Sequence, residues 1–292
     1  MKMNIKSEPE TIQALDSLFH EVGTYKNSRE FMNLLKFIKK FPKYAPYNAH
    51  LLYMQKPGSN YVAMASTWEK EFKRTIKPGA RPLIILIPFG PVGYVFDLED
   101  TEGKPVPDDL LRPFKVTGKV QEKLFNCLIN NLPCIGIRYA EGDYGSQMAG
   151  KIERCKKIQT QVIRIKKQDV SLKVLYNLCV NRNHSIDDIF PTILHELAHL
   201  FCGHFGEGQY GLYPKRQQKG IKECEFEAES VAWLVCERLG IRNPSAKYLS
   251  GYTENNNTIP NISLDNIFDS AKRIERMLYK VIQPNKELIV NE

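Results

Sequence analysis

The sequence lacks the features that mark secreted and membrane-spanning proteins. Its N-terminus, MKMNIKSEPE, has no apolar segment of the kind that forms a secretory signal. Its longest apolar run, Pro82–Gly93, is short and contains three prolines, whereas a membrane helix needs about 18 or more apolar residues. We therefore expect a cytoplasmic protein that does not enter a membrane.

The pattern of cysteines argues against two further classes, the disulfide-stabilised proteins and the Cys-based zinc knuckles. There are seven cysteines, an odd number, and no two of them form a CxxC pair. Most of them lie in apolar surroundings, which is typical of reduced thiols that fill a core. We therefore expect free cysteines with a packing role.

The composition is otherwise that of a globular protein, with one departure in its charge. Hydrophobic residues make up 42% of the 292 residues, but Lys and Arg exceed Asp and Glu by 41 to 33, a net charge of +8. Residues 1–90 hold 14 basic and 7 acidic residues, and residues 121–180 hold 10 and 5. Such a balance fits a nucleic-acid partner and a merely basic cytosolic protein equally well.

Hydrophobic periodicity predicts an α+β protein with a break before its middle. Residues 104–118 contain three prolines and a glycine, which predicts a boundary between one domain at 1–115 and another at 116–292. The second domain is expected to hold a small sheet followed by a helical part. The expected helices are 9–22, 28–41, 47–55, 67–74, 119–131, 188–203, 222–240 and 263–282, and the expected strands are 61–65, 83–89, 94–98, 134–139, 161–165 and 172–180.

The strongest chemical signal is the run His195-Glu196-Leu197-Ala198-His199, an HExxH motif in a predicted helix. Residues i and i+4 of a helix share one face, so both imidazoles can bind one metal ion. The glutamate between them can stand beside that ion and take a proton from water. In a chain with six histidines the motif arises by chance only about 0.01 times.

A metal held by two histidines needs a third protein ligand, and His204 is the first candidate. The metzincin pattern places a third histidine ten residues after the first, with a glycine at offset seven. This chain has Phe205 and Cys202 at those positions. We therefore expect His204 to lie behind the ligands, beside the substrate or at the end of the helix, where a cation is favoured.

The second source of a ligand is the acidic helix that begins near residue 222. Its buried arc is defined by apolar side chains at helical spacing, and Glu225 and Glu227 lie at the two edges of that arc. Glu229 lies further from it. The periodicity disfavours Glu229 and does not distinguish Glu225 from Glu227.

These residues resemble the ImmA/IrrE family of metallo-endopeptidases, which carries HExxH followed by an ExEAxxxA helix. The matching run here is Glu225-Phe226-Glu227-Ala228-Glu229-Ser230-Val231-Ala232. In that family the third ligand is the Glu before the Ala, so the resemblance implies Glu227. It also implies a gluzincin-like zinc peptidase that cleaves a regulatory protein or repressor. The family often has Asn where this chain has Glu229.

The front of the chain resembles the ArdC-like antirestriction N-terminal domain of bacteria and their mobile elements, an α/β domain associated with single-stranded DNA and found fused to HExxH domains. The resemblance implies a DNA partner. The residues that carry it are Ala45–Ala49, Tyr61–Ala63, Thr67–Trp68, Lys77–Leu83, Pro88–Val92 and Phe96–Asp97.

The first functional hypothesis is peptide hydrolysis that depends on Zn²⁺ or another divalent transition metal. His195, His199 and Glu227 would hold the ion, and Glu196 would act as the general base. The strand 172–180 would either pair with an extended substrate or serve as an ordinary core strand. The groups that could stabilise a developing oxyanion are His184, His204, Tyr210 and Tyr213.

The alternative is an ArdC-like antirestriction or DNA-protection protein in which proteolysis is secondary or absent. Phosphate contact with base stacking requires basic and aromatic side chains together. The candidates near Tyr61 are Trp68, Lys70, Lys73, Arg74, Lys77 and Arg81. A third hypothesis, a metal site with a purely structural role, does not require the base Glu196.

Overall fold

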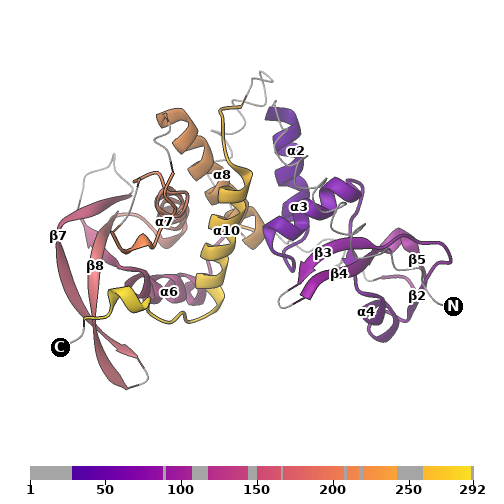
Figure 1. The fold of residues 1–292 in the computed structure, drawn as a ribbon, viewed down its shortest axis with the longest axis horizontal. Coiled ribbons are helices and arrows are strands. Elements are labelled where there is room, and N and C mark those ends of the chain that lie inside the picture. The colour runs from indigo at the N-terminus through magenta and orange to yellow at the C-terminus, as the bar shows by residue number, and fades with distance from the viewer. Residues whose placement is uncertain are drawn as a thin grey trace. The chain divides into compact units, whose positions relative to one another are not determined.

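The structure is a computed structural model of an α+β protein, as the periodicity predicts (Figure 1). It describes residues 28–87, 90–106, 118–143, 150–165, 167–206, 209–216, 220–241 and 259–290. The predicted helix 9–22 and the predicted domain boundary at residue 115 lie outside these residues. Within the described residues, no helix has both the length and the apolar character needed to cross a bilayer.

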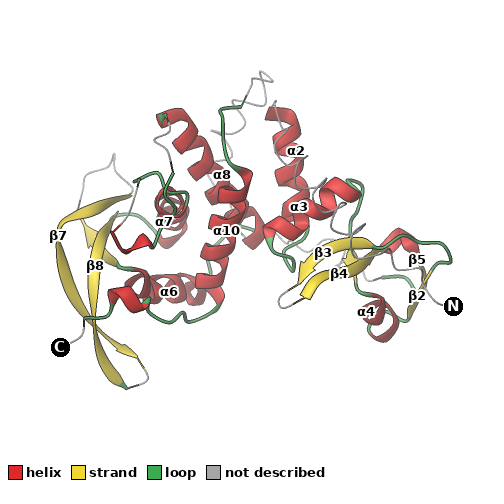
Figure 2. Cartoon of the chain, in the orientation of Figure 1, coloured by secondary structure: helices red, strands yellow, loops and turns green. Residues whose placement is uncertain are grey.

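By the contacts within it, the chain forms two compact units. The front unit comprises Met1–Phe114 with Tyr252–Ile259, and the rear unit comprises Lys115–Gly251 with Pro260–Glu292. Each unit has helices and sheets of its own (Figure 2).

The front unit packs two helices against a small antiparallel sheet with the strand order β1-β4-β3, and β2 pairs with β5 in a second, two-stranded sheet. Its elements are α2 (Ser28–Lys39), α3 (Pro46–Gln55), β1 (Val62–Ala63), α4 (Ala65–Lys70), β2 (Arg74–Ile76), β3 (Leu83–Ile87), β4 (Gly90–Asp97), a 3₁₀ turn η1 (Leu98–Asp100) and β5 (Thr101–Gly103).

Two side-chain amides of α3 close the outer edge of β3. Asn48 donates to the carbonyl of Leu86 and accepts from its N–H, at 2.9 Å in each case. Gln55 makes the same pair of bonds with Ile84, at 2.8 Å in each case. An open strand edge exposes unpaired backbone groups, so these amides replace a missing strand and hold α3 to the sheet.

The rear unit is built around a three-stranded sheet with the order β6-β8-β7 and a group of packed helices. Its elements are α6 (Glu122–Asn131), η2 (Leu132–Ile135), β6 (Ile137–Gly142), β7 (Gly150–Ile165), β8 (Gln168–Asn181), α7 (Ile186–Phe201), η3 (Gln209–Gly211), α8 (Ile221–Leu239), α10 (Leu264–Tyr279) and η4 (Lys286–Leu288).

The order of this sheet decides the role of the strand predicted at 172–180. It belongs to β8, which runs parallel to β6 on one side and antiparallel to β7 on the other. Over residues 176–180 it is paired with β6 on one edge and with β7 on the other, which favours the interpretation as a core strand. The outer strands are β6 and β7, and β7 is far longer than the predicted strand 161–165.

The predicted strand 134–139 begins later than expected. Residues Leu132–Ile135 form the 3₁₀ turn η2, with Pro133 in its first turn, and Gly136 ends it in the left-handed conformation at φ 78°. A β-carbon at Gly136 would lie 3.2 Å from Leu175 and Leu288 side-chain atoms. This glycine therefore turns the chain into β6 at a point where the packing is tight.

His50 makes the stability of the front unit depend on pH. It lies in α3 and its side chain is fully buried. Burial lowers its pKa to about 4. Below its ordinary pKa of about 6.5 the unfolded chain takes up a proton that the folded chain resists. We expect the free energy of unfolding to fall by about 2 kcal/mol from pH 7 to pH 5 because of this residue.

The measurement is chemical denaturation at both pH values, followed through Trp68 fluorescence in a Trp233→Phe background, with and without His50→Leu. Trp68 lies in the front unit and Trp233 in α8. The leucine variant is expected to lose this part of the pH dependence. An equal loss of stability in both proteins would show that His50 does not cause it.

Candidate metal centre

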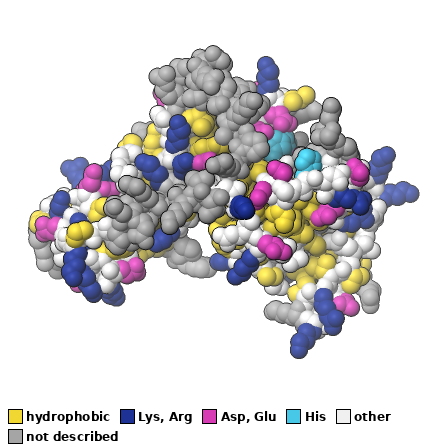
Figure 3. All heavy atoms as spheres, turned by 180° about the vertical axis from the view of Figure 1, so that it is seen from behind, with side chains coloured by type: hydrophobic (Ala, Val, Ile, Leu, Met, Phe, Trp, Pro, Cys, Tyr) yellow, Lys and Arg dark blue, Asp and Glu magenta, His cyan; other side chains and the backbone are white. Residues whose placement is uncertain are grey.

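The HExxH motif lies in the last two turns of α7, on the border between its buried face and solvent. The apolar side chains on either side of it pack into the core, which holds the helix in place. His195 and His199 keep 18% and 14% of their side chains exposed, and histidine side chains are visible at the surface beside acidic ones (Figure 3). The buried residues of this stretch are Ile193, Leu194, Leu197, Ala198, Leu200 and Phe201.

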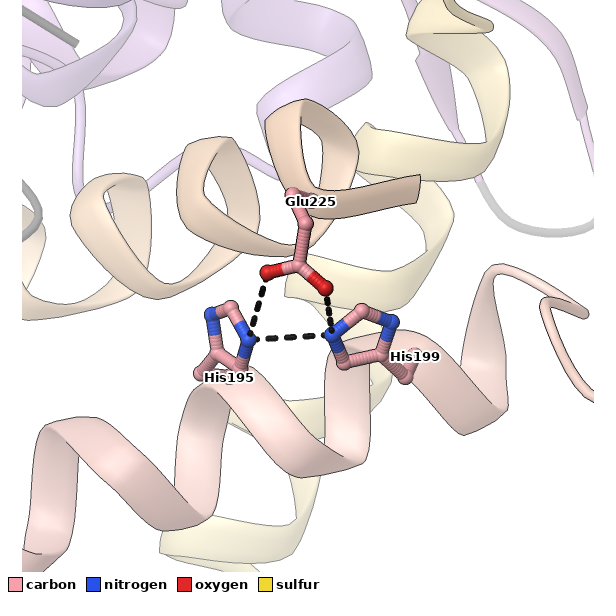
Figure 4. A group of neighbouring side chains, drawn as sticks. All are labelled: His195, His199 and Glu225. Atoms are coloured by element: carbon pink, nitrogen blue, oxygen red, sulfur yellow. Dashed lines mark hydrogen bonds and ion pairs between the residues drawn. The ribbon is translucent and has the colours of Figure 1, made fainter. Parts of the chain in front are cut away.

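Three side chains converge at this point (Figure 4). The Nε2 atoms of His195 and His199 are 2.9 Å apart. Glu225, on α8, places its Oε2 3.4 Å from Nε2 of His195 and its Oε1 3.5 Å from Nε2 of His199. Ligand atoms in a tetrahedral site with bonds of about 2.1 Å lie roughly 3.4 Å apart. The three groups therefore have the spacing of ligands to one ion.

The carboxylate beside the two imidazoles is that of Glu225, not that of Glu227 as the family resemblance implied. Glu227 lies two residues further along α8 and points to another side of the helix. Its oxygens accept from Arg216 at 2.6 and 2.9 Å and from the Ser263 N–H at 2.7 Å. The structure thus separates the two glutamates that helical periodicity left equal.

The charges around Glu227 explain why a carboxylate can be completely buried there. Burial by itself raises its pKa, but the bonds from Arg216, His204 and Ser263 outweigh burial and lower the pKa to about 2. The side chain of Glu227 is 0% exposed, whereas that of Glu225 is 41% exposed. Glu227 is therefore an ionised structural group, and Glu225 is the carboxylate that solvent and an ion can reach.

Glu229, which the periodicity disfavoured, also faces the site. One of its oxygens lies 3.5 Å from Nδ1 of His195, on the side of the ring away from Glu225. A carboxylate in this place orients a ligand histidine and makes it more basic. Burial opposes protonation of His195, but its hydrogen bond with Glu225 and the negative charges of Glu229 and Glu196 outweigh burial and raise its pKa.

Both remaining groups of the motif are in states suited to a metal site. Burial and the neighbouring His195 and His204 lower the pKa of His199 to about 4, so this imidazole is neutral at ordinary pH and can act as a ligand. Burial raises the pKa of Glu196, although its Oε2 accepts from the Ile152 N–H of β7 at 2.9 Å. A carboxylate with a raised pKa is a better proton acceptor.

The other predicted residues of this site have different places. His204 lies behind the pair, with its Nδ1 2.9 Å from Nδ1 of His199. Tyr213 is a core residue, packed on Tyr176 and donating its hydroxyl to the carbonyl of Ile135. Tyr210 is exposed, and Lys173 lies over its ring at 4.4 Å. The contacts described for the two tyrosines thus lie away from the two imidazoles.

The predicted nucleic-acid residues divide into buried and exposed groups. Trp68 is fully buried, donates from Nε1 to the carbonyl of Phe96 at 2.9 Å and packs on Phe72, so it cannot stack on a base. Arg74 joins β2 to β5 through bonds to Thr101 at 2.7 and 2.9 Å. The prediction for Trp68 is corrected, and Arg74 is a half-buried side chain that is already bonded within the front unit. The exposed members are Lys70, Lys73, Lys77 and Arg81.

Arg216 and the N–H of Ile152 contact residues of the candidate site, and no pattern in the sequence indicates either of them. Arg216 lies outside any helix or strand, eleven residues before its partner Glu227, and carries no spacing signal. The two glutamates beside the histidines did carry a spacing signal. Glu225 and Glu229 are four residues apart, as are His195 and His199, so two helices that meet along these positions bring all four together.

Comparison with known proteins gives two distant structures. The chain matches no protein-family model and no curated protein. Among solved structures it is similar to the Mn(II)-bound antirestriction ArdC protein from the R388 plasmid, with 13% identity, coverage of 79% of this chain and 82% of that one, and a TM-score of 0.36. The metal-free form gives 12%, 79%, 81% and 0.32. These TM-scores are too low to transfer a fold, ligand or activity to this chain.

Removing the carboxylate of Glu225 tests the proposed ligand set. We expect Glu225→Gln to lower the affinity for Zn²⁺ or Mn²⁺ by more than about 100-fold, because one ligand is lost, and Glu229→Gln to lower it about 10- to 100-fold. Calorimetric titration of the metal-free protein measures both. The two variants lie one turn apart on the same helix. Wild-type affinity in Glu225→Gln would exclude this carboxylate as a ligand.

Proposed function

We propose that the rear unit is a hydrolase that depends on a divalent transition metal and cleaves peptide bonds. The observation that carries the proposal is the convergence of His195, His199 and Glu225 beside Glu196. Two imidazoles and one carboxylate form a donor set that suits Zn²⁺ and also accepts other divalent transition metals. When bound, such an ion supplies Lewis acidity, which makes water more acidic and polarises a carbonyl.

Glu196 is the proposed proton acceptor. It follows His195 on α7 but is not one of the three possible ligands, His195, His199 and Glu225. Its carboxylate is therefore not needed to bind the ion and can transfer a proton. Its hydrogen bond from the Ile152 N–H holds one oxygen in place. Burial raises its pKa, which increases its ability to take a proton from water and return it to a leaving amine. A site that only stabilised the fold would not require this group.

The outer edge of β7 favours an extended peptide as the substrate. The Ile152 N–H points away from β8 and toward α7, since its partner is Glu196. Backbone groups with the same direction recur every second residue, so those of Gly150 and Arg154 face the same side. A peptide that added to this edge would run past the metal centre and be held by main-chain bonds.

The replacement Glu196→Gln separates metal binding from catalysis. We expect the variant to retain the metal, since the three ligands are intact, and to lose cleavage by at least about 100-fold, the usual effect of removing a general base. The substrate probe is a mixture of unstructured peptides prepared from a whole proteome, and mass spectrometry counts the new termini. Equal cleavage by both metal-loaded proteins would contradict the role of Glu196, and no cleavage by the wild type would contradict peptidase activity on such peptides.

As a second function, we propose that the front unit binds single-stranded DNA, as in the ArdC-like alternative. The observation that favours it is a group of four exposed cations within twelve residues, from α4 through β2 to the start of β3: Lys70, Lys73, Lys77 and Arg81. Lys77 also donates to the carbonyl of Glu99 at 2.8 Å. Because Trp68 is buried, this interaction would rest on phosphate contacts and would be sensitive to salt.

Charge reversal tests the second function. We expect replacement of Lys70, Lys73, Lys77 and Arg81 by Glu to abolish binding of a fluorescent oligothymidylate at low salt. Since each phosphate contact to a single strand contributes about 0.7 to the salt dependence, the wild-type slope of log K against log salt should be near −3. The probe is followed by anisotropy.

A matched control has the same change in net charge on exposed positions of the rear unit: Lys272, Arg276, Lys280 and Lys286, each replaced by Glu. We expect this protein to bind like the wild type. Equal weakening in the two quadruple variants would mean that only the total charge matters, and the four front-unit cations would not form a site.

A further inference from the structure

A continuous series of hydrogen bonds extends from His199 into the core, on the side away from Glu225. Nδ1 of His199 lies 2.9 Å from Nδ1 of His204. Nε2 of His204 lies 2.8 Å from Oε2 of Glu227. Arg216 then donates from both terminal nitrogens to Glu227, at 2.6 and 2.9 Å. We call the residues Arg216, Glu227 and His204 the relay.

The chemistry of the groups gives these bonds a direction. An ionised carboxylate only accepts, so Glu227 requires Nε2 of His204 to carry a hydrogen. In neutral His204 the other nitrogen, Nδ1, is then an acceptor. It must receive its hydrogen from Nδ1 of His199. The remaining nitrogen of His199, Nε2, is left with its lone pair.

That lone pair points into the metal centre. Nε2 of His199 is the atom that lies 2.9 Å from Nε2 of His195 and 3.5 Å from Glu225. A metal ligand must offer a nitrogen without a hydrogen. The relay therefore produces, from the partly buried Arg216 outward, the tautomer of His199 that a metal requires.

Glu227 is saturated in this arrangement. Its Oε1 accepts from Arg216 and from the Ser263 N–H at 2.7 Å, and its Oε2 accepts from Arg216 and His204. Each oxygen thus has two donors, which uses the acceptor capacity of the carboxylate. Glu227 could become a metal ligand only by giving up one of these bonds inside the core.

The same saturation argues against a second metal site at Cys202, His204 and Glu227, whose donor atoms also lie close together. Burial raises the pKa of Cys202 to about 12, so it is a protonated thiol, and its Sγ lies 3.2 Å from the hydroxyl of Ser270. The guanidinium of Arg216 already supplies the positive charge next to Glu227. This cluster therefore functions through hydrogen bonds.

We propose that Arg216, Glu227 and His204 are positioning residues that fix His199 as its Nδ1–H tautomer and so prepare Nε2 for a divalent metal. The inference rests on the proposed metal centre and concerns residues that do not touch the ion. A ligand histidine usually has its second nitrogen bound directly to a carboxylate or carbonyl. Here His204 lies between the two, so the carboxylate of Glu227 is two hydrogen bonds away from the ligand His199.

The first test reads the tautomers directly. Long-range ¹H–¹⁵N spectra of the metal-free full chain at pH 8 distinguish a hydrogen on Nδ1 from one on Nε2. We expect Nδ1–H for His199 and Nε2–H for His204 in the wild type. Nε2–H on His199 would overturn the proposal.

The variant Glu227→Gln should reverse both tautomers. The Ser263 N–H and one Arg216 N–H continue to donate to the Oε1 position, which therefore keeps an oxygen. The new amide nitrogen is expected to take the Oε2 position and donate to His204, and the second Arg216 N–H loses its acceptor there. His204 would then carry its hydrogen on Nδ1 and donate to His199, leaving the hydrogen of His199 on Nε2. Unchanged tautomers in a folded Glu227→Gln protein would overturn the proposal.

The second test measures affinity for Zn²⁺ by competition with a chromophoric chelator at pH 8. We expect Glu227→Gln and His204→Phe to lower the affinity about 10- to 100-fold, the usual effect of losing the partner of a ligand histidine. His204→Phe keeps the ion pair between Arg216 and Glu227, so it serves if Glu227→Gln does not fold. Wild-type affinity in His204→Phe would overturn the proposal.

Ser270→Ala is the matched control, since Ser270 is buried, contacts Cys202 and lies outside the relay. We expect its affinity for Zn²⁺ to stay within about threefold of the wild type, since it leaves the partner of His199 unchanged. A loss as large as that of His204→Phe would mean that any change in this core weakens the metal, and the relay would have no special role.

The two proposals fail in different ways. If the wild type binds no metal, the proposed function is wrong, while the spectra still establish or refute the tautomers. If the wild type binds metal and the relay variants bind it equally well, the function stands and the relay is refuted.

Discussion

The packing of α7 against α8 is the constraint on which the chemistry of the rear unit depends. Each helix carries two polar groups one turn apart, and such groups share a face. A single contact between helices therefore brings His195 and His199 against Glu225 and Glu229.

The same helix separates two carboxylates with opposite tasks. Glu225 and Glu227 are two residues apart, so they project from different sides of α8. The first stays partly exposed, where an ion can reach it, and the second is buried and neutralised by Arg216. A buried charge without a partner would cost several kcal/mol. Arg216 therefore allows Glu227 to be buried in its ionised form. Glu227 in turn accepts a hydrogen bond from His204, which is bonded to His199.

Burial also decides what the front unit can do. Trp68 and Arg74 have the residue types that bind nucleic acid, but the structure uses them to hold α4, β2 and β5 together. The cations that remain exposed can form only salt-sensitive contacts with an anion. The exposed cations of the front unit can thus contact an anion, whereas Trp68 lies in the core and cannot.

The amino-acid sequence alone determined the α+β class, the α7 helix and the convergence of the two HExxH histidines, because helical spacing places them on one face. It left Glu225 and Glu227 equal, since both lie at the edge of one apolar arc. It did not indicate Arg216, whose partner is distant in the chain, or the burial of Trp68. Only the tertiary structure decided these points, because they depend on which neighbouring element covers each side of a helix.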